Sequence, residues 1–536
     1  MTNNNIFLGS GTSVTFVPEV DIYLKPHQTA GTALTDTNGV LPSGQGNKLT
    51  LHGDFTGNFD LVNDLYVGCV LEFYDGGTFS SSHRVTTNDA TTITFHPAIT
   101  GGTFVTIVPA DDFFRLKGYG APCPATSGTS NLKHLNADNW LGIVESLTFP
   151  SVDVEFKQQN LFVGGSRNFT HQYKGIETAG NASIGIVANH GAWLYYFFGK
   201  CSSISATLAS GTNPASDFAG NTGSENKYYL ENTTLTDTGP LFYRSINNVM
   251  TPPVLEGQDA FGDLDQLTES TVGGDGFIDD PITYTFAEQD GDDLPSFAME
   301  QVFSKLPSSN PYSTRITPSG ADEDTNFVLI ATGNRVNTLT MTANENEELK
   351  MTMDCMPRKV HSLEKDEKYA ARRSVTDETT FKNFSSDDKL LEPFFFSSGS
   401  ISLFGQNFLR ITQFSLTMNN TLTDKRFIGI GSRNVKDAIP AQRTYELTFS
   451  ALVTDDKLFN ELKNNDENQL ADSGALIDLI FDKPNQEQIR LKFDNYYLTT
   501  NSWPIPEDKG AVTVDATIIP RSLSSCTVKT HWVLQG

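Results

Sequence analysis

The chain has 536 residues, a formal net charge of −26 and 38% hydrophobic residues. This length is too great for one hydrophobic core and predicts about two to four domains. The acidic balance argues against a nucleic-acid-binding surface built from Lys and Arg.

Gly and Pro, 43 and 24 in number, divide the chain into many short runs of alternating hydropathy. Alternation with a period of two, interrupted by turn dipeptides, is typical of antiparallel β structure in sandwiches or barrels. No apolar run approaches the roughly 18 residues of a membrane span, and no secretory leader follows MTNNN. We therefore predict a mainly β protein with few, short helices, made in the host cytoplasm and not inserted in a membrane.

Residues 1–140 form the first predicted domain. The segments DLYVGCVLEFYDGG, SSSHRVTTNDATTITFHPAI and GTFVTIVPADDFFRLKG alternate strongly between apolar and polar residues. These runs predict a small accessory β domain at the N-terminus.

The second predicted domain spans residues 141–363. It begins with VESLTFPSVDVEF and ends with NRVNTLTMTANENEELKMTMDC, in which NENE predicts a hairpin turn. Between these segments, residues 202–295 form a predicted insertion that is acidic and rich in Ser, Thr, Asn and Gly.

The acidic insertion contains two candidate calcium motifs. GGDGFIDD at Gly273 resembles a calcium-binding repeat, but such a repeat needs Asp where Ile278 stands. DGDD at Asp290 begins like an EF-hand loop, but Pro295 occupies the position where that loop needs Gly. A solvated acidic loop is therefore favoured over a calcium site.

A charged bridge at residues 364–393 leads to the last predicted domain, residues 394–536. Its strand-like segments are FFFSSGSISLFGQNFLRITQFSLTM, IRLKFDNYYLTT and GAVTVDATIIP. GSRN at Gly431 in this domain repeats GSRN at Gly165, and SLTM at Ser415 matches SLTF at Ser146 in the preceding domain.

A gap-free alignment on GSRN extends this similarity. It places Ile186 on Leu452 and Trp193 on Phe459. In each copy an alternating segment (ASIGIVA, LTFSALV) precedes a short amphipathic one (GAWLYYFFGK, DDKLFNELKN). Each copy is therefore predicted to contain a strand, a long polar loop with GSRN, a second strand and a short helix.

Residue types that carry catalysis or bind ligands lack a productive spacing. The nine histidines show no metal-binding pattern, and the five scattered cysteines fit free thiols better than a disulfide framework. No nucleophile elbow, phosphate-binding loop or dinucleotide fingerprint occurs. We predict no enzyme activity, no metal and no cofactor.

The segment FSLTMNNTLTDKRFIGIGSRNVKDAIPAQRTYELTFSALVTDDKLFNEL resembles the tail tube proteins of long-tailed bacteriophages. The segment from VESLTFPSVDVEF to LYYFFGK resembles the same unit in a more diverged form. The resemblance covers most of residues 140–536, whereas residues 1–140 and the acidic insertion depart from the family plan. It implies a virion protein with two tube-type β units that polymerises into stacked rings and forms the conduit for DNA.

The resemblance also implies partners and contact residues. The partners are further copies of the chain and the tape measure, tail terminator and baseplate proteins, with phage DNA passing unbound through the lumen. If each chain supplies two of six ring units, the ring is a trimer with pseudo-six-fold symmetry. Inter-subunit or inter-ring contacts are predicted at Arg167, Asn168, Asn419, Asn420, Lys425, Arg426, Arg433 and Asn434.

Alternative interpretations remain. A baseplate hub, spike or capsid protein would share the fold, and a glycan-binding or glycan-active surface protein would share the composition. Arg167 and Arg433 could bind an anion, although a loop turn with Arg facing a neighbouring subunit is favoured.

Overall fold

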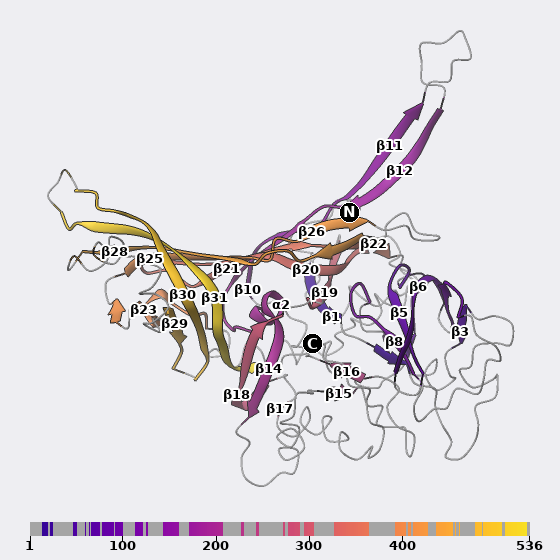
Figure 1. The fold of residues 1–536 in the computed structure, drawn as a ribbon, viewed down its shortest axis with the longest axis horizontal. Coiled ribbons are helices and arrows are strands. Elements are labelled where there is room, and N and C mark those ends of the chain that lie inside the picture. The colour runs from indigo at the N-terminus through magenta and orange to yellow at the C-terminus, as the bar shows by residue number, and fades with distance from the viewer. Residues whose placement is uncertain are drawn as a thin grey trace, which may run out of the picture.

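The computed structural model describes the following residues, apart from short gaps: 13–24, 47–50, 59–60, 64–99, 113–126, 143–159, 171–206, 227–229, 243–245, 272–304, 326–363, 392–460 and 477–532. Within these ranges the fold is almost entirely antiparallel β, as the sequence predicted (Figure 1). The shortest strands include β4 (Phe59–Asp60), β9 (Ala125–Thr126), β15 (Lys227–Tyr229), β16 (Tyr243–Ser245) and β17 (Val272–Gly273).

A continuous wall of antiparallel strands runs through the molecule (Figure 1). In spatial order the strands are β10 (Ile143–Thr148), β13 (Ala182–Val187), β21 (Lys350–Met356), β20 (Asn326–Asn344), β25 (Ile411–Asn419), β28 (Thr444–Leu452), β31 (Thr513–Trp532) and β30 (Gln488–Ser502). The order β10-β13-β21-β20 of the first unit repeats as β25-β28-β31-β30 in the second unit. The pairing therefore agrees with the duplication that the sequence indicated.

The register of the wall identifies equivalent residues in the two units. Val144 of β10 lies opposite Ile186, and Phe414 of β25 lies opposite Phe449. Ile186 therefore corresponds to Phe449, and the gap-free alignment that placed it on Leu452 was wrong by three residues. The alignment failed because the connection between the two strands is longer in the first unit.

Strands β20, β30 and β31 extend beyond the wall. Outside it, they pair with further strands in each unit. The strands of these outer parts include β1 (Ser13–Glu19), β19 (Ser296–Ser304), β22 (Lys359–Leu363), β23 (Gly399–Leu403), β24 (Gln406–Phe408) and β29 (Ile477–Asp482). In the first unit β1 pairs with β19, and β19 and β22 pair with β20. In the second unit β23 pairs with β29, and β29 pairs with β30. Strand β1 thus takes the place in the first unit that β23 takes in the second.

A separate six-stranded sheet follows β1 in the sequence. Its spatial order is β2 (Ile22–Leu24), β8 (Phe113–Leu116), β5 (Val70–Asp75), β6 (Thr78–Asn88), β7 (Thr92–His96) and β3 (Lys48–Thr50). Because β1 already belongs to the large sheet, this inserted sheet stands between two strands of the first unit and not in front of it.

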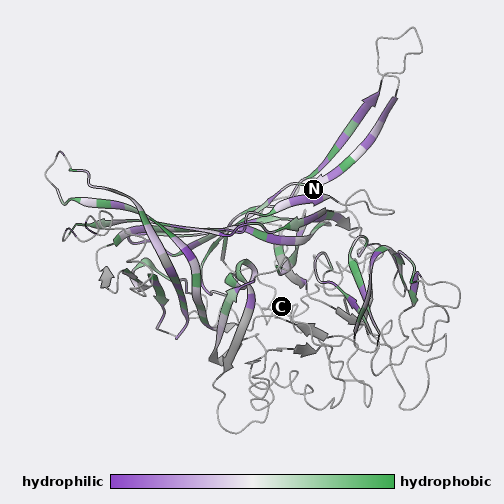
Figure 2. Cartoon of the chain, in the orientation of Figure 1, coloured by the Kyte–Doolittle hydropathy of each residue, from purple (hydrophilic) through white to green (hydrophobic). Residues whose placement is uncertain are grey.

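The apolar face of the wall forms the main core. Leu416 and Met418 of β25 are fully buried, while the alternate residues point to the other face, a pattern visible along the strands in Figure 2. Helix α2 (Leu194–Phe198) packs in this core, and all five of its residues are buried. It ends at Gly199, whose φ of 93° suits glycine at a helix C-terminus.

Helix α2 lies in the first predicted amphipathic segment. The second such segment lies mostly outside the described residues, although Asn460 N donates to Asp456 O at 2.9 Å, as in a helical turn. After α2, β14 (Gly199–Ala206) pairs with β18 (Phe277–Glu288), and β18 pairs with β31 of the second unit. Most of the acidic insertion, including Asp290, also lies outside the described residues.

Each unit sends a two-stranded hairpin out of the wall between its first two strands. In the first unit the hairpin is formed by β11 (Val152–Gln159) and β12 (His171–Ala179), and it projects far from the body (Figure 1). In the second unit it is formed by β26 (Thr423–Arg426) and β27 (Lys436–Ile439). The predicted NENE turn joins β20 to β21, with Asn346 at a φ of 65°.

Candidate functional site

The two outer edges of the wall are the first candidate site. Among the described residues, β10 pairs on one side with β13, and the half of β30 in the wall pairs on one side with β31. At the β10 edge Val144 is 38% exposed, whereas its equivalent Phe414 is 4% exposed. The side chain at this edge is therefore open to solvent where its equivalent in the second unit is buried.

The seam between the units shows how such an edge is covered. Here β20 pairs with β25 over seven residues, from Thr338 opposite Asn419 to Asn344 opposite Gln413. Leu339, Met341, Leu416 and Met418 on the two strands are fully buried there. The seam therefore combines a backbone ladder with a closed apolar layer.

Asn420 fixes the end of this seam. Its Nδ2 donates to Val336 O at 3.0 Å and to Phe197 O at 3.1 Å, and its Oδ1 accepts from Arg443 Nε at 2.8 Å. Its Nδ2 thus links the second unit to β20 and α2 of the first, while its Oδ1 bonds within the second unit. The sequence predicted Asn420 as an inter-subunit contact, and the structure places it at a contact between units of one chain.

The other predicted contact residues have different settings. Asn419 Oδ1 accepts from Thr421 N at 2.7 Å, which closes a local turn. Lys425, which is exposed, and Arg426 lie in β26. The remaining four residues belong to the two GSRN segments and lie outside the described residues: Arg167, Asn168, Arg433 and Asn434.

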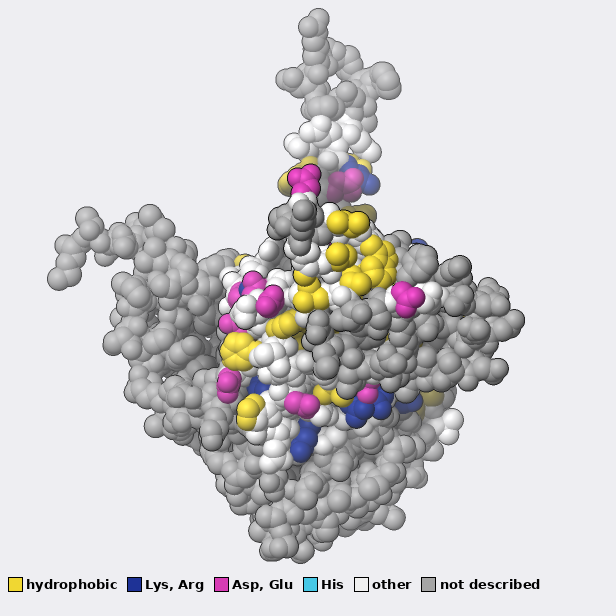
Figure 3. All heavy atoms as spheres, turned by 90° about the vertical axis from the view of Figure 1, so that its left-hand side faces the viewer, with side chains coloured by type: hydrophobic (Ala, Val, Ile, Leu, Met, Phe, Trp, Pro, Cys, Tyr) yellow, Lys and Arg dark blue, Asp and Glu magenta, His cyan; other side chains and the backbone are white. Residues whose placement is uncertain are grey.

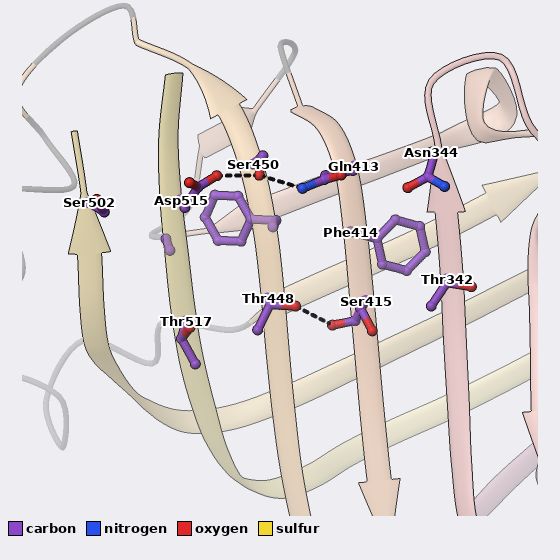
Figure 4. A pocket seen from close by; sticks show the side chains of 12 residues that line it. Thr342, Asn344, Gln413, Phe414, Ser415, Thr448, Ser450, Ser502, Asp515 and Thr517 are labelled. Carbon is purple, nitrogen blue, oxygen red and sulfur yellow. Dashed lines mark hydrogen bonds between the residues drawn. The ribbon is translucent and has the colours of Figure 1, made fainter. Parts of the chain in front are cut away.

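The polar face of the wall carries an open cavity of about 600 Å³. Its lining combines hydroxyl groups, including Ser415, Thr448 and Ser450, with the apolar side chains of Phe414 and Phe449 (Figure 4). Ser450 Oγ hydrogen-bonds to Asp515 and accepts from Gln413 Nε2 at 2.8 Å. This surface is suited to holding water.

The charges on this face are mostly acidic. Asp354, Glu446 and Asp515 are exposed on it. Lys350, also at this face, pairs with Glu145 of β10 at 3.1 Å. The described part of this face therefore offers little free positive charge to a polyanion.

A buried cluster joins the inserted sheet to both units. We define this junction cluster as Glu19, Tyr119, Arg335, Arg358 and Ala438. Arg335 lies over the Tyr119 ring, 3.9 Å from its centroid, and donates to Ala438 O at 2.7 Å. Ala438 N donates to the Tyr119 hydroxyl at 3.0 Å. Three parts of the chain meet here, because Tyr119 follows β8, Arg335 lies in β20 and Ala438 lies in β27.

Glu19 is buried, with only 4% of its surface exposed, and its carboxyl group accepts three hydrogen bonds. Its Oε2 accepts from Ser296 Oγ at 2.6 Å and Gly120 N at 2.9 Å, and its Oε1 accepts from Gly333 N at 2.8 Å. Burial raises the pKa of Glu19 to about 7, while these donors and the charge of Arg358 oppose the rise.

Arg358 completes the junction cluster. Its guanidinium donates to Tyr119 O at 2.7 Å and to Gly68 O. A Cβ at Gly120 or Gly333 would lie 2.7 or 2.5 Å from the Arg358 side chain, and both residues have positive φ. Glycine is therefore required at both positions. Sequence reasoning missed this cluster because no local spacing connects residues so far apart in the chain.

The described residues give no sign of a metal centre. No group of three His, Cys, Asp or Glu side chains is placed to hold a metal ion in this part of the chain. Cys69, Cys355 and Cys526 are buried free thiols, in keeping with the sequence. No helix in the described ranges is long and apolar enough to cross a membrane.

The open edges of the wall present unpaired backbone N–H and C=O groups that can pair with another chain. A family model for phage tail tube proteins matches residues 32–516 of the chain. The chain therefore belongs to the phage tail tube protein family, and it is a structural component of the virion tail, as the resemblance implied. The match includes most of residues 1–140, which the sequence comparison had left outside the family plan.

Solved structures also resemble part of the chain. Each is 10% identical and covers 24% of the length of this chain. One is a chain of a native gene transfer agent virion (TM-score 0.19, 96% of that chain covered), and another comes from the C6-symmetric tail of an empty gene transfer agent particle (0.17, 92%). A third belongs to the anti-feeding prophage baseplate (0.19, 89%). These TM-scores are too low to add to the family assignment. No curated protein matches the chain.

Proposed function

We propose that three copies of this chain close into one ring of the tail tube, in which each copy supplies two units. The observation that carries the proposal is the repeated strand order, because β20 of the first unit pairs with β25 of the second. Strands β30 and β10 are the equivalents of β20 and β25 at the outer edges. A neighbouring copy that places its β10 against β30 extends the wall by the same rule, until the ring closes.

The seam within the chain predicts the register of the seam between chains. Leu339 lies opposite Met418 in the chain, and the equivalent residues are Leu498 and Phe149. Phe149 directly follows β10 and is partly buried against the core, while Val144, near the other end of β10, is exposed. We expect a neighbouring β30 to cover both side chains and to contribute roughly 25 cal/mol for each Å² of apolar surface that it buries.

We assign the polar face of the wall to the lumen. The opposite face is closed by the core and by α2, so the hydroxyl-rich face is the one available to line a conduit. Exposed Asp354, Glu446 and Asp515 would repel DNA phosphates, so that DNA passes through without specific binding.

The remaining roles are those that family membership implies. The rings stack into the tube, deliver DNA to the host, and contact the tape measure, tail terminator and baseplate proteins. The first tube unit then comprises β1 and residues 141–363, and the bridge 364–393 joins it to the second unit at 394–536. The inserted sheet and the acidic segment 202–295 are additions to the first unit. We expect no catalytic activity in the assembled tube.

Cysteine cross-linking tests the ring. Ser502 and Ser146 are the equivalents of Thr342 and Ser415, which lie opposite each other in the seam of the chain. In tubes of the double variant Ser146→Cys with Ser502→Cys, oxidation should join chains into closed covalent trimers. Native mass spectrometry after tube dissociation would count the chains. The two single variants are the matched controls and should remain uncross-linked. A covalent hexamer, or no cross-linked species, would contradict the trimeric ring.

A further inference from the structure

The two hairpins of the chain have unequal surroundings. The hairpin β26–β27 is held by the inserted sheet: Arg84 of β6 pairs with Asp437 at 3.3 Å, and the Tyr119 hydroxyl accepts from Ala438 N at 3.0 Å. Arg335 of the first unit binds the other backbone group of Ala438. The second hairpin is therefore fixed along its β27 strand by residues of its own chain.

The base of the second hairpin also has an apolar seat. Leu422 and Ala438 form a small buried cluster with Leu294, and Met356 packs against this cluster. Leu422 N donates to the Asn337 side chain at 2.7 Å. The seat is thus made from β20, from the end of β21 and from Leu294, which precedes β19, and it shows what kind of surface receives such a hairpin.

The first hairpin carries apolar side chains without such cover. Val152, Phe156, Tyr173 and Ile176 are 44%, 62%, 39% and 38% exposed. An isolated two-stranded ribbon is at best marginally stable in water, so these side chains favour a partner surface. Figure 3 shows apolar, acidic and basic side chains side by side on the stem of the projecting hairpin.

The charge on this hairpin favours a protein partner over a nucleic acid. Lys174 pairs with Glu177 at 2.8 Å, and Asp153, Glu155 and Lys157 add charges of both signs. Mixed charge around exposed apolar residues is usual at protein interfaces, whereas a DNA-binding arm needs a positive excess.

The insertion explains why only one hairpin is held. The inserted sheet stands between β1 and β10 of the first unit, whereas between β23 and β25 of the second unit the structure has only the short strand β24 in its described residues. If chains join in a ring by the repeated rule, the second unit of each chain lies beside the first hairpin of the next. That unit has no inserted sheet with which to hold the hairpin.

We propose that the inserted sheet is a clamp, which retains the second hairpin within its own chain and leaves the first hairpin to join rings. The partner of the first hairpin is a second copy of this chain in the adjacent ring. This inference rests on the proposed trimeric ring, and it predicts three joining hairpins for each ring interface instead of six. The seat of the second hairpin supports a partner of the same kind, since it is built from this chain's own wall and inserted sheet.

Two variants of the full chain separate ring formation from ring stacking. Phe156→Glu combined with Tyr173→Glu places charge on the exposed face of the first hairpin. Native mass spectrometry should still find trimers, while electron microscopy should show at least a tenfold fall in mean tube length. The matched control is Phe79→Glu in the inserted sheet, where Phe79 is 52% exposed. This control should form tubes of normal length.

Tubes of normal length from the hairpin variant would overturn the proposal. Loss of trimers together with tubes would also overturn it, because the hairpin would then act within a ring. Rings of another size in the unmodified protein would instead refute the proposed function itself.

The clamp has its own test in the same tubes. Arg84→Glu places like charges beside Asp437 and should speed amide exchange in β26 and β27 about fivefold, while tube length stays normal. The matched control is Lys157→Glu, a charge reversal on the first hairpin, which should leave amide exchange in β26 and β27 unchanged. Unchanged exchange in the Arg84 variant would show that the inserted sheet does not clamp the second hairpin.

Discussion

The first and second units share the order of their strands and differ in the segments added between them. The first unit carries the inserted sheet, a long hairpin and the acidic insertion, whereas the second has a short hairpin and, between β23 and β25, the short strand β24. None of these additions changes the pairing of the wall. The comparison shows that the wall edges are constrained by their partner strands, while the connections are free to acquire new contacts.

The largest contrast is expected between two equivalent leucines. Leu416 is fully buried in the seam within the chain, and its equivalent Leu147 is partly buried at the open β10 edge. Leu416→Ala should lower the free energy of unfolding by about 2–5 kcal/mol. Leu147→Ala should lower it by about 1 kcal/mol in the free chain, because less apolar surface is lost. Urea unfolding measures the loss of unfolding free energy in each variant. Equal losses would show that the β10 edge is already covered within a single chain.

The first strands of the two units also differ, because β1 ends in buried Glu19 and β23 (GSISL) has no carboxylate. The pKa of Glu19 is raised from 4.5 to about 7, so the folded chain holds its proton over a range where the unfolded chain has lost it. Stability should therefore fall as pH rises from about 4.5 to about 7, by about 3 kcal/mol.

Glu19→Gln should remove this part of the pH dependence. The difference in unfolding free energy between the two proteins, measured at several pH values, cancels the titration of other groups. A constant difference across this range would show that Glu19 has an ordinary pKa in the folded chain.

A smaller contrast is expected at the ends of the first wall strands. Asn420 bonds to Val336 O and Phe197 O, and Asn420→Ala should cost about 1–3 kcal/mol because it leaves buried groups without partners. Ser151, the residue at the same place in the first unit, is exposed. Ser151→Ala should change the free energy of unfolding by less than about 0.5 kcal/mol. Thermal unfolding would reveal whether the two positions differ.

The smallest effect is expected at the ion pair between Arg84 and Asp437. Their side chains are 27% and 23% exposed, and the N···O distance is 3.3 Å. A double-mutant cycle with Arg84→Met and Asp437→Asn should give a coupling of less than about 1 kcal/mol, decreasing with added salt. A coupling above about 2 kcal/mol would mean that this contact, and not the backbone of Ala438, dominates the clamp.

Much of the wall could be predicted from the sequence, because short stretches of neighbouring residues determine where its strands and turns lie. Alternation in ASIGIVA and LTFSALV predicted strands, NENE predicted the turn between β20 and β21, and LYYFF lies in a predicted amphipathic segment. The repeat of SLTF and SLTM identified strands that occupy the same place in the pairing. Local periodicity and turn chemistry decide these features.

Long-range features could not be predicted in this way. The pairing of β1 with β19 joins residues almost 300 positions apart, and the residues around Glu19 lie on separate segments. The buried role of Asn420 also depends on α2 and β20 arriving beside it. An Asn-rich strand end is polar in sequence, and only the packing of distant elements turns one of its amides inward.

The position of β31 has a consequence for how the protein is made. This last strand, Thr513–Trp532, pairs with β18 of the first unit and with β28 and β30 of the second. During synthesis, neither unit has its full set of strand neighbours until β31 has left the ribosome. The high sequence separation of these pairs slows folding. The synthesis of β31 is therefore the step after which both units can complete their folding.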